Sequence, residues 1–178
     1  MTDLAAAFAR AFELADRGRY SASPNPRVGA VVLAPGGEVV GEGWHERAGG
    51  AHAEVMALAE AGSRARGATV VLNLEPCAHH GRTPPCADAL VEAGVARVVF
   101  STLDPDSRTA GKGRERLREA GIATETGPFA ERAERLNEPF FASVRNGRPH
   151  VHLKWGAALD GRIATASGKS RWITGEEA

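Results

Sequence analysis

The chain has 178 residues, 43% of them hydrophobic, and its 22 lysine and arginine residues balance 22 aspartate and glutamate residues. This length predicts one domain with some additional chain, and the zero net charge argues against a nucleic-acid coat or a membrane-surface binder. The chain contains no run of about 18 apolar residues and its N-terminus lacks the basic region of a secretory signal, so we expect a cytoplasmic protein.

The first part of the chain predicts a helix, a hairpin and a second helix. Apolar residues recur at helical spacing over residues 4–17. Two apolar runs, at 28–33 and 39–43, flank a Pro-Gly-Gly turn, and this pattern is typical of a β-hairpin. Residues 52–61 then form an alanine-rich helix that ends at a glycine.

The second part alternates apolar strands with helices. Strands are predicted at 68–74, 96–102 and 122–126, and helices at 85–93, 111–120 and 129–144. Such alternation predicts a three-layer α/β/α domain with a mixed, mostly parallel central sheet, to which the hairpin adds an antiparallel edge. A new strand is predicted near His150.

Three side chains suit a metal. Cys77 and Cys86 are the only cysteines, and in a reducing compartment a close pair indicates metal binding or catalysis more often than a disulfide. His52 begins a helix, Cys77 follows a strand and Cys86 lies at the start of the next helix, so all three are expected at one edge of the sheet. Three ligands favour one catalytic zinc per chain with water in the fourth position, because a structural zinc takes four.

Glu54 lies in the first turn of the helix that His52 begins. This position is close to the predicted metal but outside its ligand set. A carboxylate there can take a proton from the metal's water and deliver it to a substrate. We therefore predict that Glu54 is the catalytic acid–base group.

At this point the sequence resembles the zinc-dependent deaminases of the cytidine deaminase superfamily, whose signature is H-x-E followed by P-C-x-x-C. His-Ala-Glu at 52–54 and Pro-Cys at 76–77 match, but eight residues separate the two cysteines instead of two. The longer spacing in EPCAHHGRTPPC resembles the deaminase half of the bifunctional riboflavin-biosynthesis deaminase/reductase, diaminohydroxyphosphoribosylaminopyrimidine deaminase. Further matching stretches are NPRVGAVV, RVVFSTLDPD and AERLNEPF.

This resemblance implies a cytidine-deaminase-like domain over residues 1–147. It implies hydrolytic deamination of 2,5-diamino-6-(5-phosphoribosylamino)pyrimidin-4(3H)-one to 5-amino-6-(5-phosphoribosylamino)uracil in riboflavin biosynthesis. The expected partner is thus a phosphorylated pyrimidine, with no nucleic acid or membrane, and homo-oligomers are common in the superfamily. Positions that match substrate contacts are Asn25, His45, His79, Arg82 and Asp104.

One stretch departs from the resemblance. The family usually has Asn-Pro after Asp-Pro, whereas this chain has Asp106 and Ser107. A carboxylate in place of a neutral amide is expected to weaken the binding of a phosphorylated ligand.

Other interpretations stay open on the sequence alone. Asn25, between two prolines, fits a turn as well as a pocket, and His45 fits solvent as well as a pocket. The enzyme could deaminate another ring, such as cytidine, guanine or a base in tRNA, although the low aromatic content disfavours nucleic acid. A non-catalytic, zinc-stabilised interaction domain is a further alternative, but it would have no use for Glu54.

Residues 148–178 resemble the start of the reductase half, where Ser170 and Trp172 match positions that contact substrate and NADPH. The segment is too short to build a nucleotide-binding sheet, so NADPH is expected only in a complete reductase half. We predict that this chain deaminates but does not reduce, as a truncated form of a longer product. Its tail is expected to be disordered or packed on the deaminase domain.

Overall fold

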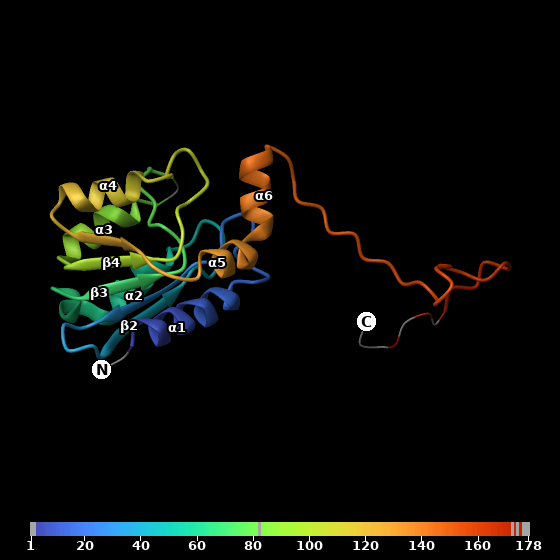
Figure 1. Cartoon of the computed structure of the whole chain (residues 1–178), viewed down its shortest axis with the longest axis horizontal. Helices are drawn as coiled ribbons and strands as arrows, with labels where there is room; N and C mark the ends of the chain where they lie inside the picture. Colours follow the sequence, from blue (N-terminus) through green and yellow to red (C-terminus); the bar gives the residue numbers. More distant parts are fainter. Residues whose placement is uncertain (1–2, 82, 172, 174, 176–178) are drawn as a thin grey trace.

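The computed structural model describes residues 3–81, 83–171, 173 and 175, which form a five-stranded sheet with helices on both faces and an extended tail (Figure 1). The sheet has the order β2-β1-β3-β4-β5. Its strands are β1 (Gly29–Leu33), β2 (Val39–Trp44), β3 (Thr69–Leu72), β4 (Arg97–Phe100) and β5 (Ala123–Thr126).

Strand β1 is antiparallel to both of its neighbours, whereas β3, β4 and β5 are mutually parallel. Four of the five strands therefore run in one direction, as predicted. The hairpin forms the predicted antiparallel edge, with β2 outermost and β1 between β2 and β3. The sequences of β1 and β2 explain why β2 is the outer strand. All five residues of β1 are apolar or small and buried, while β2 carries Glu42.

Seven helical segments were found in the described chain. They are α1 (Leu4–Arg17), α2 (Ala53–Ala61), the 3-10 turn η1 (Gly62–Ala65), α3 (Cys86–Ala93), α4 (Lys112–Glu119), α5 (Ala130–Leu136) and α6 (Glu138–Asn146).

The single helix predicted over 129–144 is wrong, because the chain breaks at Asn137 into α5 and α6. Pro139 follows in the first turn of α6, where a proline costs no helical hydrogen bond. Gly147 ends α6 with a positive φ of 64°.

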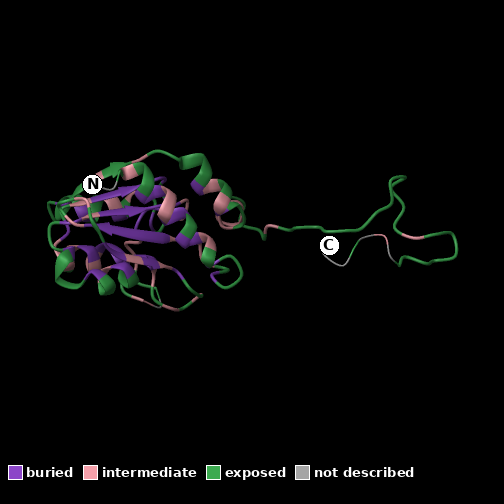
Figure 2. Ribbon diagram, turned by 90° about the horizontal axis from the view of Figure 1, so that it is seen from below, coloured by how far each residue is buried: buried purple, intermediate pink, exposed green. Residues whose placement is uncertain are grey.

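The core has one apolar cluster on each face of the sheet, and in Figure 2 the buried strands lie between the two helix layers. Helix α1 packs on one face against alternate residues of β1, β3 and β4, including Val31, Val71 and Val99. The opposite face packs against α2, α3 and α4 through Val32, Val70 and other residues. No described helix is long and apolar enough to cross a membrane.

Two glycines of β2 let α2 lie directly on the strand backbone. A Cβ atom on Gly41 would be 2.2 Å from the carbonyl oxygen of Ala57, and one on Gly43 would be 2.4 Å from that of Ala53. The buried face of α2 consists mainly of alanines. The position of α2, and of the residues at its N-terminus, is therefore set by close backbone packing.

The tail leaves α6 at Gly147 and extends away from the rest of the molecule (Figures 1 and 2). The strand predicted near His150 is absent from its described residues, since no other strand lies beside it to pair with. Val151, Leu153 and Trp155 are 80%, 78% and 66% exposed. Of the two alternatives predicted for the tail, packing on the domain is not found in the part that the structure describes.

Candidate functional site

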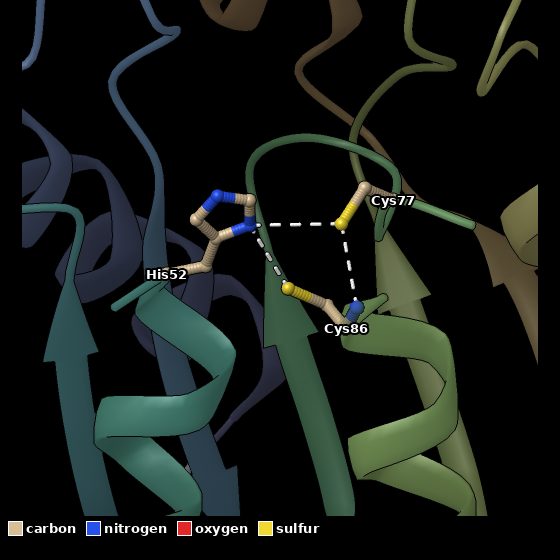
Figure 3. Close-up of side chains that lie close together, drawn as sticks. All are labelled: His52, Cys77 and Cys86. Carbon is tan, nitrogen blue, oxygen red and sulfur yellow. Dashed lines mark hydrogen bonds between the residues drawn. The ribbon is translucent and has the colours of Figure 1, made fainter. Parts of the chain in front are cut away.

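His52, Cys77 and Cys86 meet at the carboxyl end of β3 (Figure 3). His52 is the N-cap residue of α2, Cys86 is the first residue of α3, and Cys77 lies in the segment after β3. The Nδ1 atom of His52 is 3.1 Å from the Sγ atom of Cys86 and 3.6 Å from that of Cys77. All three atoms lie within 4.8 Å of one another.

This arrangement fits a zinc ion. Zinc bonds to nitrogen and sulfur of about 2.0–2.3 Å place tetrahedral ligand atoms roughly 3.5–3.8 Å apart, close to the separations found here. One imidazole nitrogen and two sulfurs are also the donors that zinc prefers. The structure thus brings together the three residues that the sequence predicted.

The two thiols share their hydrogen bonds in a way that favours a thiolate. A hydrogen bond from the Cys86 thiol lowers the pKa of Cys77 to about 4, and the same bond together with burial raises the pKa of Cys86. The backbone N–H of Cys86, at the start of α3, also donates to the Sγ atom of Cys77 over 3.3 Å. Thiolate is the form of cysteine that binds metal.

Glu54 is 3% exposed and lines the same cavity as His52 and Cys77. Burial is the main reason that the pKa of its carboxyl is raised to about 7, and the nearby charge of Cys77 adds to the effect. A carboxyl with a pKa near neutrality can both accept and donate a proton at physiological pH.

The cavity has a volume of about 450 Å³, which suits a small molecule. Four of the five predicted substrate residues line it: Asn25, His45, His79 and Asp104. The fifth, Arg82, lies outside the described residues, as does Trp172. Ser170 is exposed in the tail and is not among the residues of the cavity wall.

Asn25 and His45 form a hydrogen-bonded chain along one wall. The Nδ1 atom of His45 is 3.0 Å from the carbonyl oxygen of Ala51, which can only accept, so Nδ1 carries the proton. The Nε2 atom then accepts from the Nδ2 atom of Asn25 over 3.0 Å. Burial lowers the pKa of His45, which is 3% exposed, and this favours the neutral ring. Both residues therefore belong to the pocket, and the alternative of a solvent-facing His45 is wrong.

Another part of the cavity wall comes from the loop after β4. Asp104 is 8% exposed, and burial is the main reason that its pKa is raised to about 6. Its Oδ1 atom accepts the backbone N–H of Asp106 over 2.8 Å. His79 lies beside this loop, with its Nδ1 atom 3.1 Å from the hydroxyl of Thr109.

Two residues that support the pocket were missed by sequence reasoning. Glu75 is buried and accepts three backbone N–H groups, from Asp104 at 3.2 Å, Gly111 at 2.9 Å and Arg114 at 3.0 Å. It thereby joins the segment before Cys77 to the Asp104 loop and to the N-terminus of α4.

Asn137, at the break between α5 and α6, is the second. Its side-chain amide accepts the N–H of Arg27 over 2.7 Å and donates to the carbonyl of Arg27 over 2.9 Å. This fixes the segment that carries Asn25, while Phe140 of α6 lines the cavity. The sequence signal was an asparagine followed by Glu-Pro inside an apparently continuous helix.

Comparison with known proteins agrees with this geometry. Residues 1–102 match the family described as cytidine and deoxycytidylate deaminase zinc-binding region. The chain is 56% identical over 170 residues to the riboflavin biosynthesis protein RibD of Escherichia coli, a match that covers 96% of this chain and 46% of that protein.

Solved structures agree with the fold. Acinetobacter baumannii RibD superposes with a TM-score of 0.91 at 49% identity, over 97% of this chain and 49% of that one. A diaminohydroxyphosphoribosylaminopyrimidine deaminase/5-amino-6-(5-phosphoribosylamino)uracil reductase from Thermotoga maritima gives 0.88 at 43% identity, over 97% of this chain and 50% of that one. The predicted cytidine-deaminase-like fold is confirmed, and the chain spans about half the length of these relatives.

Proposed function

The chain belongs to the family of zinc-binding cytidine and deoxycytidylate deaminases, and on that premise we propose that it is the deaminase of riboflavin biosynthesis. Its substrate is 2,5-diamino-6-(5-phosphoribosylamino)pyrimidin-4(3H)-one. The ring loses its 2-amino group as ammonia and becomes 5-amino-6-(5-phosphoribosylamino)uracil. The identity to RibD proteins over nearly the whole chain supports this substrate.

One observation carries the proposal. Glu54 is buried beside a cluster of one imidazole and two sulfurs, in a cavity large enough for a nucleotide-sized molecule. Burying a carboxyl next to the metal costs stability. An interaction domain stabilised by zinc gains nothing in return, whereas an enzyme gains a group that transfers protons.

His52, Cys77 and Cys86 would hold the zinc, since their donor atoms already face one another. A zinc with three protein ligands supplies a water whose pKa is lowered to about 7. Glu54 accepts a proton from the attacking water and delivers it to the ring nitrogen beside the reacting carbon. A second proton reaches the amine through Glu54, so one water is consumed and one ammonia is released.

The walls of the cavity would position the ring. Because Asn25 donates its Nδ2 hydrogen to His45, its Oδ1 atom is available to accept from the substrate. Asp104, in another part of the wall, offers a second acceptor, or a donor when it holds its proton. The ring's amino groups and N–H donors match these acceptors.

A small molecule rather than nucleic acid is the inferred partner. The described cavity wall includes the carboxyl groups of Glu54, Glu75, Asp104 and Asp106 but only one arginine, Arg108, whereas a continuous phosphate backbone needs many cations. Two free cysteines suit a reducing cytosol, where we place the enzyme.

The test is a mass-spectrometric and ammonia assay of the zinc-loaded chain with the phosphoribosylaminopyrimidine. We expect Glu54→Gln to retain its zinc and its fold but to lose at least about 100-fold in turnover, as is typical when a general acid–base group is removed. Glu92→Gln, an exposed residue of α3, is the matched control and should behave as the wild type.

Near-normal turnover by Glu54→Gln would show that another group moves the proton. A wild-type chain that is inert on this substrate but deaminates cytidine, guanine or a tRNA base would replace the proposed substrate with that ring.

A further inference from the structure

The charge of the cavity wall is unbalanced for an anionic substrate. Among its described residues, Glu54, Glu75, Asp104 and Asp106 carry carboxyl groups, and Arg108 is the one lysine or arginine. A phosphorylated substrate brings further negative charge into this cavity. Arg108 is thus the described residue best suited to receive it.

Arg108 is held in place by Asp106, two residues earlier. Its Nε atom lies 3.0 Å from both carboxylate oxygens, and its Nη2 atom donates to Oδ2. The backbone N–H of Arg108 donates to Oδ1 over 2.9 Å. The pKa of Asp106 is lowered mainly by the hydrogen bond from Arg108, so the carboxylate stays ionised.

This pair leaves part of the guanidinium free. Nε and Nη2 are engaged, whereas Nη1 makes no hydrogen bond to any residue in the described part of the chain. A guanidinium has five N–H donors in a rigid plane, so one edge can bind a carboxylate while another binds a phosphate.

Exposure indicates which end of the substrate meets Arg108. Glu54, at the reacting end, is 3% exposed, whereas the side chains of Asp106 and Arg108 are 15% and 68% exposed. The reacting carbon must reach Glu54 on the cavity floor. The phosphate, at the far end of the ribose, then lies towards the mouth, where Arg108 is.

We propose that Arg108, oriented by Asp106, binds the phosphate of the substrate and makes the enzyme selective for the phosphorylated form. The inference rests on the proposed function for the identity of the substrate. It also changes the expectation for Asp106, because the carboxylate orients the phosphate-binding arginine instead of repelling the ligand.

Kinetics of the zinc-loaded chain with the phosphorylated substrate and its dephosphorylated counterpart test the proposal. We expect Arg108→Gln to raise KM for the phosphorylated form at least about 10-fold, as for loss of a charge-assisted hydrogen bond, and to change KM for the other form less than about 2-fold. Arg162→Gln is the control, because Arg162 pairs with Asp160 at the same two-residue spacing in the exposed tail.

A double variant separates phosphate binding from mere neutralisation of Asp106. If Arg108 binds phosphate, Asp106→Asn/Arg108→Gln remains as impaired as Arg108→Gln. If Arg108 only cancels the charge of Asp106, the double variant regains wild-type KM and the proposal is overturned. Equal effects of Arg108→Gln on both substrates would also overturn it.

Calorimetric titration with ribose 5-phosphate, with ribose as reference, gives a readout that needs no turnover. Binding of the phosphorylated sugar alone, weakened about 10-fold in Arg108→Gln, supports the proposal even in a chain that is inert on the pyrimidine. If the wild type deaminates the pyrimidine, but Arg108→Gln prefers ribose 5-phosphate over ribose as strongly as the wild type does, this inference is refuted. The proposed function is then left intact.

Discussion

Cys86 is the residue at which the metal assignment can be tested most directly. It is fully buried, and its Sγ atom lies within 4.8 Å of the donor atoms of His52 and Cys77. By analogy with other three-ligand catalytic sites, we expect about one zinc per chain in the wild type. The zinc content should fall sharply in Cys86→Ser. Elemental analysis of the purified chains measures this, and an unchanged zinc content would refute the ligand set.

Asp104 provides a prediction on stability. Its pKa rises from 3.8 to about 6 on folding, mainly through burial, so the folded chain holds this proton more tightly than the unfolded chain. The contribution of Asp104 to stability therefore falls as the pH rises from about 4 to about 6, and stays low above that range. Asp104→Asn removes this cost and keeps an oxygen for the N–H of Asp106.

We expect metal-free Asp104→Asn to be more stable than the metal-free wild type at pH 8, by up to about 3 kcal/mol. The difference should shrink towards zero near pH 4. Urea unfolding of both chains in the presence of a chelator measures it. A gain that is equal at the two pH values would show that the charge of Asp104 is not its cause.

Much of the site was predictable at the residue scale because its chemistry is encoded locally. His52 and Glu54 lie two positions apart, and Cys77 and Cys86 lie in one short stretch, so residue type and spacing were sufficient. Glu75 and Arg108 were not predictable in the same way. Their roles depend on which backbone and side-chain groups surround them in the folded chain.

Helix α2 carries His52 and Glu54, and its position depends on a glycine in β2. A Cβ atom on Gly43 would be 2.4 Å from the carbonyl oxygen of Ala53 and 2.6 Å from the nitrogen of Ala57. Gly43→Ala must therefore push α2 away from the sheet. We expect a loss of about 1–3 kcal/mol, as is typical of overpacking, together with weaker zinc binding.

Gly36→Ala is the matched control, because a Cβ atom at Gly36 meets nothing within 4 Å. Chemical denaturation and zinc titration of the two variants are the measurements. If Gly43→Ala unfolds and binds zinc like Gly36→Ala, the close packing of α2 does not position the metal ligands.

The elements themselves were largely predictable, and their arrangement was not. Apolar runs, turn residues and helical spacing located the hairpin, the buried strands and most helices within a few residues. The interior place of β1 and the break at Asn137 depend on contacts between distant segments. The amide of Asn137 binds the backbone of Arg27, 110 positions away, and no local pattern contains that information.

At the scale of the whole molecule, the described part of the tail is largely exposed. Its described residues after Gly147 extend away from the sheet and helices, with Val151 and Leu153 largely exposed. We expect a chain that ends at Gly147 to keep the thermal midpoint of the full chain within about 2 °C, since no buried area is removed. Its zinc content and deaminase turnover should also be unchanged.

Calorimetry and the ammonia assay compare the two lengths. We also expect neither form to oxidise NADPH in the presence of the deaminated product, because the described chain has one five-stranded sheet, and that sheet carries the proposed deaminase site. A lower midpoint for the shorter chain would show that the tail packs on the domain in solution. Steady consumption of NADPH by the full chain would show that it assembles a cofactor site.

The strand order has a consequence for how the protein is made. After the β1–β2 hairpin, β3 joins the free side of β1, β4 joins β3 and β5 joins β4, so each strand emerging from the ribosome meets a partner already synthesised. The three predicted ligands all precede residue 87, whereas Asp104, Arg108 and Phe140 follow. The proposed metal ligands of a nascent chain are thus complete before the part of the cavity wall that contains Asp104 and Arg108 has been translated.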